Sequence, residues 1–173
     1  MKWGLSGAPI PSNLPYAAAI NRAALATQAS PLALYAIAWR ETIASERSGW
    51  LVAAYGPGTT AANVVSSDGG HGLFQITDLP IPENWADPYA NAVWASEHFY
   101  EPYLIDWLDR GFSGTTLLKL AADDYNAGDS AVLVAHDSGD ADAATTGGNY
   151  GEDVVVIYGN LLAGRDPDSG RPS

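Results

Sequence analysis

The stretch LALYAIAW, residues 32–39, is apolar on every side. A helix without a polar face belongs in a protein interior, so the rest of the chain has to fold around it. Ser30 and Pro31 precede the stretch and are typical of a helix start, because serine caps the first turn and proline fits its first position. The apolar run stops at Arg40 and Glu41. The sequence therefore predicts a central buried helix that ends in an acidic residue.

The remainder of the chain favours further helices joined by loops. Helix-forming residues cover 15–28, and Asp87-Pro88 opens a longer helix that Pro102 should kink or split. Other helices are expected at residues 47–55, 115–126, 130–136 and 154–162, with a loop at 137–148. The apolar run 70–76 lies between glycines and fits either a strand or a helix.

These patterns predict a single, mainly α domain. A chain of 173 residues can bury a core of its own. We expect an irregular N-terminal arm over residues 1–14, because glycines and prolines interrupt it. The domain itself should span residues 15–163, and residues 164–173 should form a frayed C-terminal tail.

Charge and composition narrow the classes of partner. Twenty acidic residues against eight basic ones give a net charge of −12, which repels phosphate backbones and anionic lipid. We therefore expect neither nucleic acid nor membrane as a partner, and we expect a monomer. The sequence has no cysteine, which excludes thiolate metal sites and cysteine nucleophiles. Its apolar runs are shorter than the about 20 residues that span a bilayer, and its first residues lack the apolar core of a signal peptide.

Glu41 is the first candidate for chemistry. An ionised carboxylate in apolar surroundings loses its hydration, and the negative end of a helix dipole acts in the same direction, so both effects raise the pKa. A carboxyl that is protonated near neutral pH suits a general acid. The alternative is that Glu41 forms a salt bridge with Arg40 or Arg47 and has no chemical role.

Five segments, taken in order, resemble one family. PYAAAINRAALATQASPLALYAIAWRET (15–42) is similar to the opening helices of the soluble lytic transglycosylase and goose-type lysozyme superfamily, in which a catalytic Glu ends a helix. GLFQI (72–76) resembles its Gly-Leu-Met-Gln motif, and the helical segment 87–104 resembles the helix that follows. DYNAG (124–128) resembles the Ala-Tyr-Asn-Ala-Gly motif, and NYGEDVVVIY (149–158) resembles the closing helix with its active-site Tyr.

The resemblance implies a lysozyme-like α fold with a substrate cleft. It implies cleavage of the β-1,4 bond between N-acetylmuramic acid and N-acetylglucosamine in peptidoglycan, with Glu41 as the general acid. Gln75 would bind sugar substituents on the cleft floor, and Tyr125 and Tyr150 would line the adjacent subsite, with Tyr150 touching the acid. Asn126 would tie the helix end to the cleft wall.

Two further residues of the cleft loop are candidates for substrate binding. Phe74 stands where the family usually has Met, and His71 directly precedes the motif. The alternative is that Phe74 and the motif tyrosines are ordinary core aromatics, and that His71 is a loop histidine without a role. His98 and its acidic neighbours are too sparse for a metal site, so we expect neither a metal nor a cofactor.

The family runs two chemistries, which differ in their need for a second carboxylate. Lytic transglycosylases use one Glu and close a 1,6-anhydro ring, whereas goose-type lysozymes resemble inverting hydrolases, in which a second carboxylate activates water. Asp68 is the best candidate for that carboxylate, and Asp78 fits loosely; alternatively, Asp68 caps its own glycine turn. Asp123 and Asp124 replace the small apolar residues of the family motif, and a solvated face is the favoured interpretation over a place in the cleft.

Three interpretations of function remain open at this point. The first is a cell-wall muramidase, for which the missing signal peptide and small size favour a bacteriophage lysin, made in the host cytoplasm and acting on the wall. The second is a lysozyme-like module that has lost catalysis and serves as a wall-binding or virion structural part. The third keeps the enzyme and changes the substrate to chitin-like N-acetylglucosamine polymers.

Overall fold

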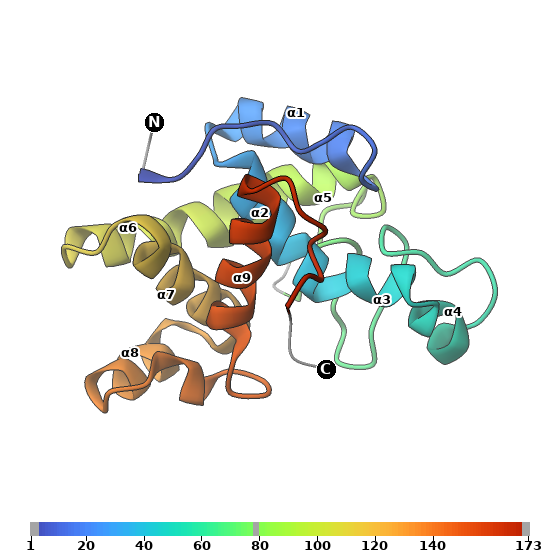
Figure 1. The fold of residues 1–173 in the computed structure, drawn as a ribbon. Helices are drawn as coiled ribbons and strands as arrows, with labels where there is room; N and C mark the ends of the chain where they lie inside the picture. Colours follow the sequence, from blue (N-terminus) through green and yellow to red (C-terminus); the bar gives the residue numbers. More distant parts are fainter. Residues whose placement is uncertain (1–3, 78–79, 171–173) are drawn as a thin grey trace.

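The apolar stretch forms the central helix that its sequence predicts. In the computed structural model, which describes residues 4–77 and 80–170, helix α2 (Pro31–Ala38) lies in the middle of the molecule, behind α9 (Tyr150–Leu162) (Figure 1). Every α2 residue after Pro31 is buried, and α2 packs against α9 and against α1 (Ala17–Thr27). The Ser30 side chain accepts a hydrogen bond from the backbone N–H of Ala33, which confirms the predicted cap. Residues 1–3 of the predicted N-terminal arm and residues 171–173 of the predicted C-terminal tail lie outside the described residues.

The central helix does not end at Glu41, and that prediction is wrong. The helix continues through a π-helical turn, η2 (Trp39–Ile43), into α3 (Ala44–Arg47). The backbone N–H of Ala44 bonds to the carbonyl of Trp39, which widens the helix by one residue without breaking it. The first residue that departs from helical geometry is Gly49, at φ 80°. Glu41 therefore lies within a helix rather than at its negative end.

The remaining helices surround this centre. They are α4 (Trp50–Tyr55), α5 (Pro88–Ala95), the π-helical η3 (Ser96–Tyr100), α6 (Glu101–Asp109), α7 (Gly114–Ala127), α8 (Asp129–Asp137) and the 3-10 helix η4 (Ala141–Ala144). The predicted mainly α fold is thus confirmed. The loop predicted at 137–148 contains a short helix, η4, and the last helix begins at Tyr150 rather than at Val154.

Proline and aspartate set the geometry of the α5–α6 segment. The Asp87 side chain accepts a hydrogen bond from the N–H of Ala90, at 2.8 Å, and so caps α5 as predicted. Pro102 lies in the first turn of α6, where its missing N–H is tolerated, and the π-helical η3 directly precedes it. The predicted irregularity is therefore present, as a widened turn between α5 and α6. Within the described ranges, none of the helices has the length and apolar character needed to cross a bilayer.

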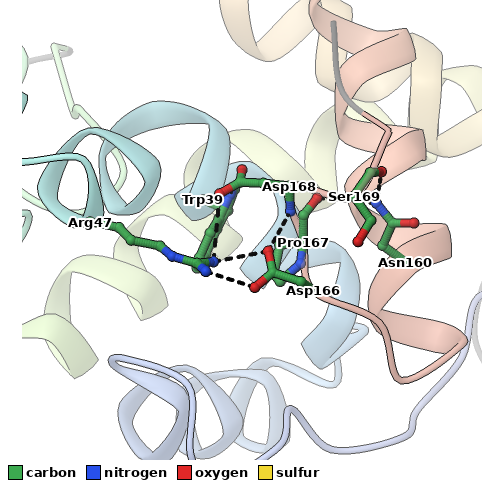
Figure 2. Close-up of polar contacts among 7 residues, drawn as sticks. All are labelled: Trp39, Arg47, Asn160, Asp166, Pro167, Asp168 and Ser169. Atoms are coloured by element: carbon green, nitrogen blue, oxygen red, sulfur yellow. Dashed lines mark hydrogen bonds and ion pairs between the residues drawn. The ribbon is translucent and has the colours of Figure 1, made fainter. Parts of the chain in front are cut away.

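The C-terminal segment is held against the back of the π-turn, so the predicted frayed tail is wrong for the described residues (Figure 2). The indole N–H of Trp39 donates to Asp168 at 2.8 Å, and Arg47 donates two hydrogen bonds to Asp166, at 2.9 and 2.7 Å. The Asn160 amide donates to two backbone carbonyls of the same segment. These contacts anchor the C-terminal segment to η2 and α3.

Candidate active site

A polar pocket of ≈ 140 Å³ lies beside the π-turn. Side chains and backbone from three parts of the chain form it: the π-turn itself, the loop that follows α4, and the end of α7. The lining residues are Glu41, Asp68, Gly70, Gln75, Thr77, Tyr125 and Asn126. Four other residues predicted to bind or cleave substrate therefore line one pocket with Glu41: Asp68, Gln75, Tyr125 and Asn126. Glu41 and Asn126 are 85 positions apart in the sequence (126 − 41).

The Glu41 side chain is half-buried, and Tyr150 holds it. The Tyr150 hydroxyl donates a hydrogen bond to Glu41 Oε1, which is the contact that the resemblance implies. The Arg40 guanidinium instead pairs with Asp153, Nε to Oδ2 at 2.9 Å, and lies over the Tyr150 ring. Arg47 is engaged with the C-terminal segment. Neither arginine pairs with Glu41, so the salt bridge considered as an alternative is absent.

Burial raises the pKa of Glu41 to about 7. Loss of hydration is the largest cause, and the nearby negative charge of Asp68 acts in the same direction. The Tyr150 hydrogen bond and the Arg40 charge favour the ionised form but do not outweigh it. The carboxyl is therefore divided between its neutral and ionised forms near neutral pH. The expected direction is correct. Of the two expected causes, desolvation applies and the helix dipole does not, because Glu41 does not lie at a helix terminus.

The pKa of Asp68 is shifted in the opposite direction to that of Glu41. Its carboxylate is exposed, lines the same pocket, and accepts a hydrogen bond from the Ser66 hydroxyl. That hydrogen bond holds the pKa of Asp68 below its ordinary value, so the group is ionised at neutral pH. Ser66 also accepts from the N–H of Gly70 at 3.0 Å. Asp68 thus belongs both to its own glycine turn and to the pocket, and the two interpretations are compatible.

The turn that carries Gln75 is tightly braced. Residues 70–76 form neither predicted alternative, strand or helix, but a turn with isolated bridges at its ends. The Thr42 hydroxyl donates to the carbonyl of Leu73 at 2.8 Å, which ties the turn to the π-helical segment. Gly72 has φ 66° and leaves no space for a side chain, since a Cβ would lie 2.9 Å from Asn91 Nδ2. Gln75 itself has φ 49° and donates its amide to the Gly72 carbonyl at 2.9 Å.

The end of α7 closes the pocket. The Tyr125 hydroxyl donates to the backbone carbonyl of Phe74, which joins α7 to the Gln75 turn. Asn126 Oδ1 accepts a hydrogen bond from the N–H of Thr146 at 2.7 Å. Asn126 therefore ties the helix end to the loop after η4, which does not line the pocket, rather than to the cleft wall that the resemblance implies, and it also lines the pocket itself.

Several predicted site residues lie elsewhere. Phe74 is fully buried and does not line the pocket, so its side chain cannot meet a sugar there. His71 is half-buried outside the pocket lining, and its ring packs edge-on against Trp85 at 5.0 Å. Asp123 and Asp124 do not form a solvated face, because both side chains are almost completely buried. Asp78, the other candidate for the second carboxylate, lies outside the described residues.

Several residues that brace the site are not predicted from the sequence. Asn91 accepts a hydrogen bond from the N–H of Phe74 at 2.9 Å and donates to the carbonyl of His71 at 3.1 Å. Its only sequence signal is a polar residue on an otherwise apolar helical stripe. Thr77 lines the pocket and Ser66 orients Asp68, and no spacing rule marks either of them.

No protein-family model matches this chain, and searches of curated proteins and of solved structures find no similar protein. Among residues 4–77 and 80–170, no cluster of three or more histidine or carboxylate side chains is arranged to hold a metal ion. What the pocket offers is one carboxyl with a raised pKa, one ionised carboxylate, and amide side chains suited to polar ligands.

Proposed function

We propose that this protein is a peptidoglycan muramidase with a lysozyme-like fold, in which Glu41 is the general acid. The observation that carries the proposal is the pairing in one pocket of Glu41, whose pKa is raised to about 7, with the ionised Asp68. Most glycosidases cleave the glycosidic bond with two carboxyls, of which one is protonated and the other ionised. The family resemblance of the motifs gives the substrate class, the β-1,4 bond between N-acetylmuramic acid and N-acetylglucosamine.

The contacts of Glu41 suggest how the proton is held. Tyr150 donates to Oε1, which leaves Oε2 to carry the acid proton. Glu41 gives this proton to the bridging oxygen as the bond from that oxygen to the anomeric carbon breaks. The side-chain amides of Gln75 and Asn126 lie in the same pocket and are suited to bind the acetamido and hydroxyl groups of the sugar.

Asp68 favours hydrolysis over transglycosylation in this proposal. An ionised carboxylate that lines the pocket of the acid can accept a proton from a water molecule that attacks the anomeric carbon from the opposite face. The water oxygen then bonds to that carbon, and the proton on Asp68 returns to Glu41 through solvent. Lytic transglycosylation is the second candidate, since Glu41 alone could act first as acid and then as base on the 6-hydroxyl of the sugar.

The mass of the released muropeptides tests the proposal. Hydrolysis yields reducing ends, whereas transglycosylation yields anhydro sugars that are one water lighter. Chitin oligomers incubated in parallel distinguish the third interpretation. Release of no soluble fragment from peptidoglycan, by a preparation shown to be folded, would refute the muramidase and leave an inactive wall-binding or virion module. For an active enzyme we expect a lysin that acts on the cell wall.

A further inference from the structure

A second group of charged side chains lies between α7, η4 and α9, outside the pocket. Lys119 Nζ pairs with Asp123 at 2.9 Å and with Asp142 at 2.6 Å. Both aspartate side chains are buried, at 0% and 5% exposure, whereas the Lys119 side chain keeps a route to solvent at 29%. Buried carboxylates are costly unless they are fully hydrogen-bonded, so their partners indicate what they do.

Those partners are the first backbone groups of α9. Asn149 gives α9 no side-chain cap, and the N–H of Gly151 instead donates to Asp123 and to Asp142, at 2.8 Å each. The preceding N–H, that of Tyr150, donates to the hydroxyl of Thr145 at 3.2 Å. The start of α9 is thus capped from a distance, by side chains of α7 and of the η4 segment.

The fit leaves no freedom at this helix start. A Cβ on Gly151 would lie 2.3 Å from Asp123 Oδ1 and 2.6 Å from the carbonyl of Lys119, so only glycine fits against α7. Tyr150, the residue directly before it, is the side chain that donates to Glu41. The same turn of backbone therefore connects the buried charges to the acid.

We propose that Asp123 and Asp142, with Lys119, are positioning residues that fix the Tyr150 hydroxyl against Glu41. The inference rests on the proposed role of Glu41 as general acid and concerns the same site. The aspartates do not touch the pocket, and they act only through the start of α9. This assigns a purpose to Asp123, which stands where the resembling family has a small apolar residue.

The two aspartates have pKa values that are shifted in opposite directions. Burial and the neighbouring Asp142 raise the pKa of Asp123 to about 7, while the hydrogen bonds from Asp123 and Lys119 lower that of Asp142. Asp123 is then largely neutral over the acidic range and Asp142 is the anion that Lys119 balances. Asparagine keeps one oxygen that can accept from the Gly151 N–H, although its NH2 cannot accept from Lys119. Asp123→Asn should therefore preserve the cap, whereas alanine should not.

The test is a ¹³C NMR titration of the Glu41 carboxyl in variants of the whole chain. Glu41 faces Tyr150 from α9, Tyr125 from α7, Arg40 beside it and Asp68 from the loop. Of these, the Tyr150 hydrogen bond and the Arg40 charge lower its pKa, and the hydrogen bond has the larger effect. Displacing Tyr150 should therefore raise the Glu41 pKa, by about one unit, in Asp123→Ala and further in the double variant Asp123→Ala/Asp142→Ala.

The sign of the shift separates positioning from simple electrostatics. Removing negative charge at a distance lowers the pKa of a carboxyl, whereas loss of the Tyr150 hydrogen bond raises it. Asp123→Asn should restore the wild-type value. Glu152→Gln, an exposed charge change in the same turn of α9, is the matched control and should leave the titration unchanged. If the alanine variants do not fold, Thr145→Val removes the acceptor of the Tyr150 N–H and should give an upward shift.

A downward or absent shift in the folded alanine or valine variants would overturn the positioning role. Muropeptide release by the same preparations tests the proposed function independently. Displacement of Tyr150 should lower kcat by up to about 10²-fold with little change in KM, since misplaced catalytic groups lose rate rather than binding. Wild-type protein that releases no fragment while the titration shifts upward would refute the muramidase and retain the positioning contact.

Discussion

Two carboxyls in this protein have similarly raised pKa values and differ in their surroundings. Glu41 and Asp124 both have a pKa raised to about 7 by burial. Glu41 opens on a polar pocket that it shares with Asp68, whereas Asp124 is enclosed between α6 and α7, with Trp107 donating to one oxygen and the other oxygen without a partner. Both carboxyls have a raised pKa, so it is access for a substrate that favours Glu41 over Asp124 as the proposed general acid.

The largest effect should come from replacing each of these carboxyls with its amide. Glu41→Gln removes the proposed proton donor and should lower muropeptide release by about 10²–10⁴-fold, the usual contribution of a general acid. Asp124→Asn should leave the rate within about twofold, because Asp124 does not line the pocket. Release rates at saturating peptidoglycan measure both, with circular dichroism as the check of folding. Equal losses in the two variants would break the comparison.

Asp68→Asn should give the next largest loss if the enzyme is a hydrolase. The amide cannot accept a proton from water, so we expect the rate to fall by about 10²-fold with a small change in KM. Ser67→Ala, an exposed change at the neighbouring position, is the control. A rate unaffected by Asp68→Asn, together with anhydro products, would assign the chemistry to Glu41 alone.

The pH profile should report the same carboxyl. A general acid must be protonated, so kcat/KM should fall as pH rises through the Glu41 pKa of about 7. Tyr150→Phe removes the hydrogen bond that favours the ionised form and should move this basic limb upward, by about one unit. Tyr158→Phe, a tyrosine of the same helix outside the pocket lining, should leave the limb in place. A limb that moves downward in Tyr150→Phe would contradict the assignment.

The smallest effect should be on stability. Glu41 and Asp124 have folded pKa values near 7, above their ordinary 4.5 and 3.8, so the folded state binds protons more tightly than the unfolded state. The contribution of these two groups to the free energy of unfolding should therefore be largest below about pH 4 and decrease as pH rises toward 7. Asp124→Asn should recover about 1 kcal/mol at pH 8, roughly 2–4 °C in Tm, and nothing at pH 4. Thermal melts at both pH values measure this, and a gain at pH 4 alone would reverse the sign.

Helix starts and the central helix could be predicted because their signals are local. Ser30 and Asp87 cap their helices in the expected way, and the apolar run 32–39 is buried throughout. The end of the central helix could not be predicted in this way. No glycine or proline follows Glu41 for several residues, and the change from an apolar to a polar pattern marks a change of surroundings rather than a break in the backbone.

The site was predictable to the extent that motif order brings residues together. Glu41, Gln75, Tyr125 and Asn126 do meet in one pocket, with Tyr150 against the acid. Side-chain direction inside the turn at 70–76 was not predictable, because it depends on left-handed backbone at Gln75 and on contacts from distant helices. The burial of Asp123 was missed for a similar reason: Asp142, which shares Lys119 with it, lies in η4, almost twenty positions away.

The widened turn at Trp39–Ile43 makes this stretch sensitive to length. Its bond from the Ala44 N–H to the Trp39 carbonyl holds one more residue than an ordinary α-helical turn would. A π-helical turn takes up one extra residue within itself, so deleting a single residue here would restore a regular α-helix and leave α3 in nearly the same orientation. The side chains within the turn would shift, and with them the contact of Thr42 with the Leu73 carbonyl. Such a deletion is therefore expected to disturb the pocket beside Glu41 more than the helices on either side of the turn.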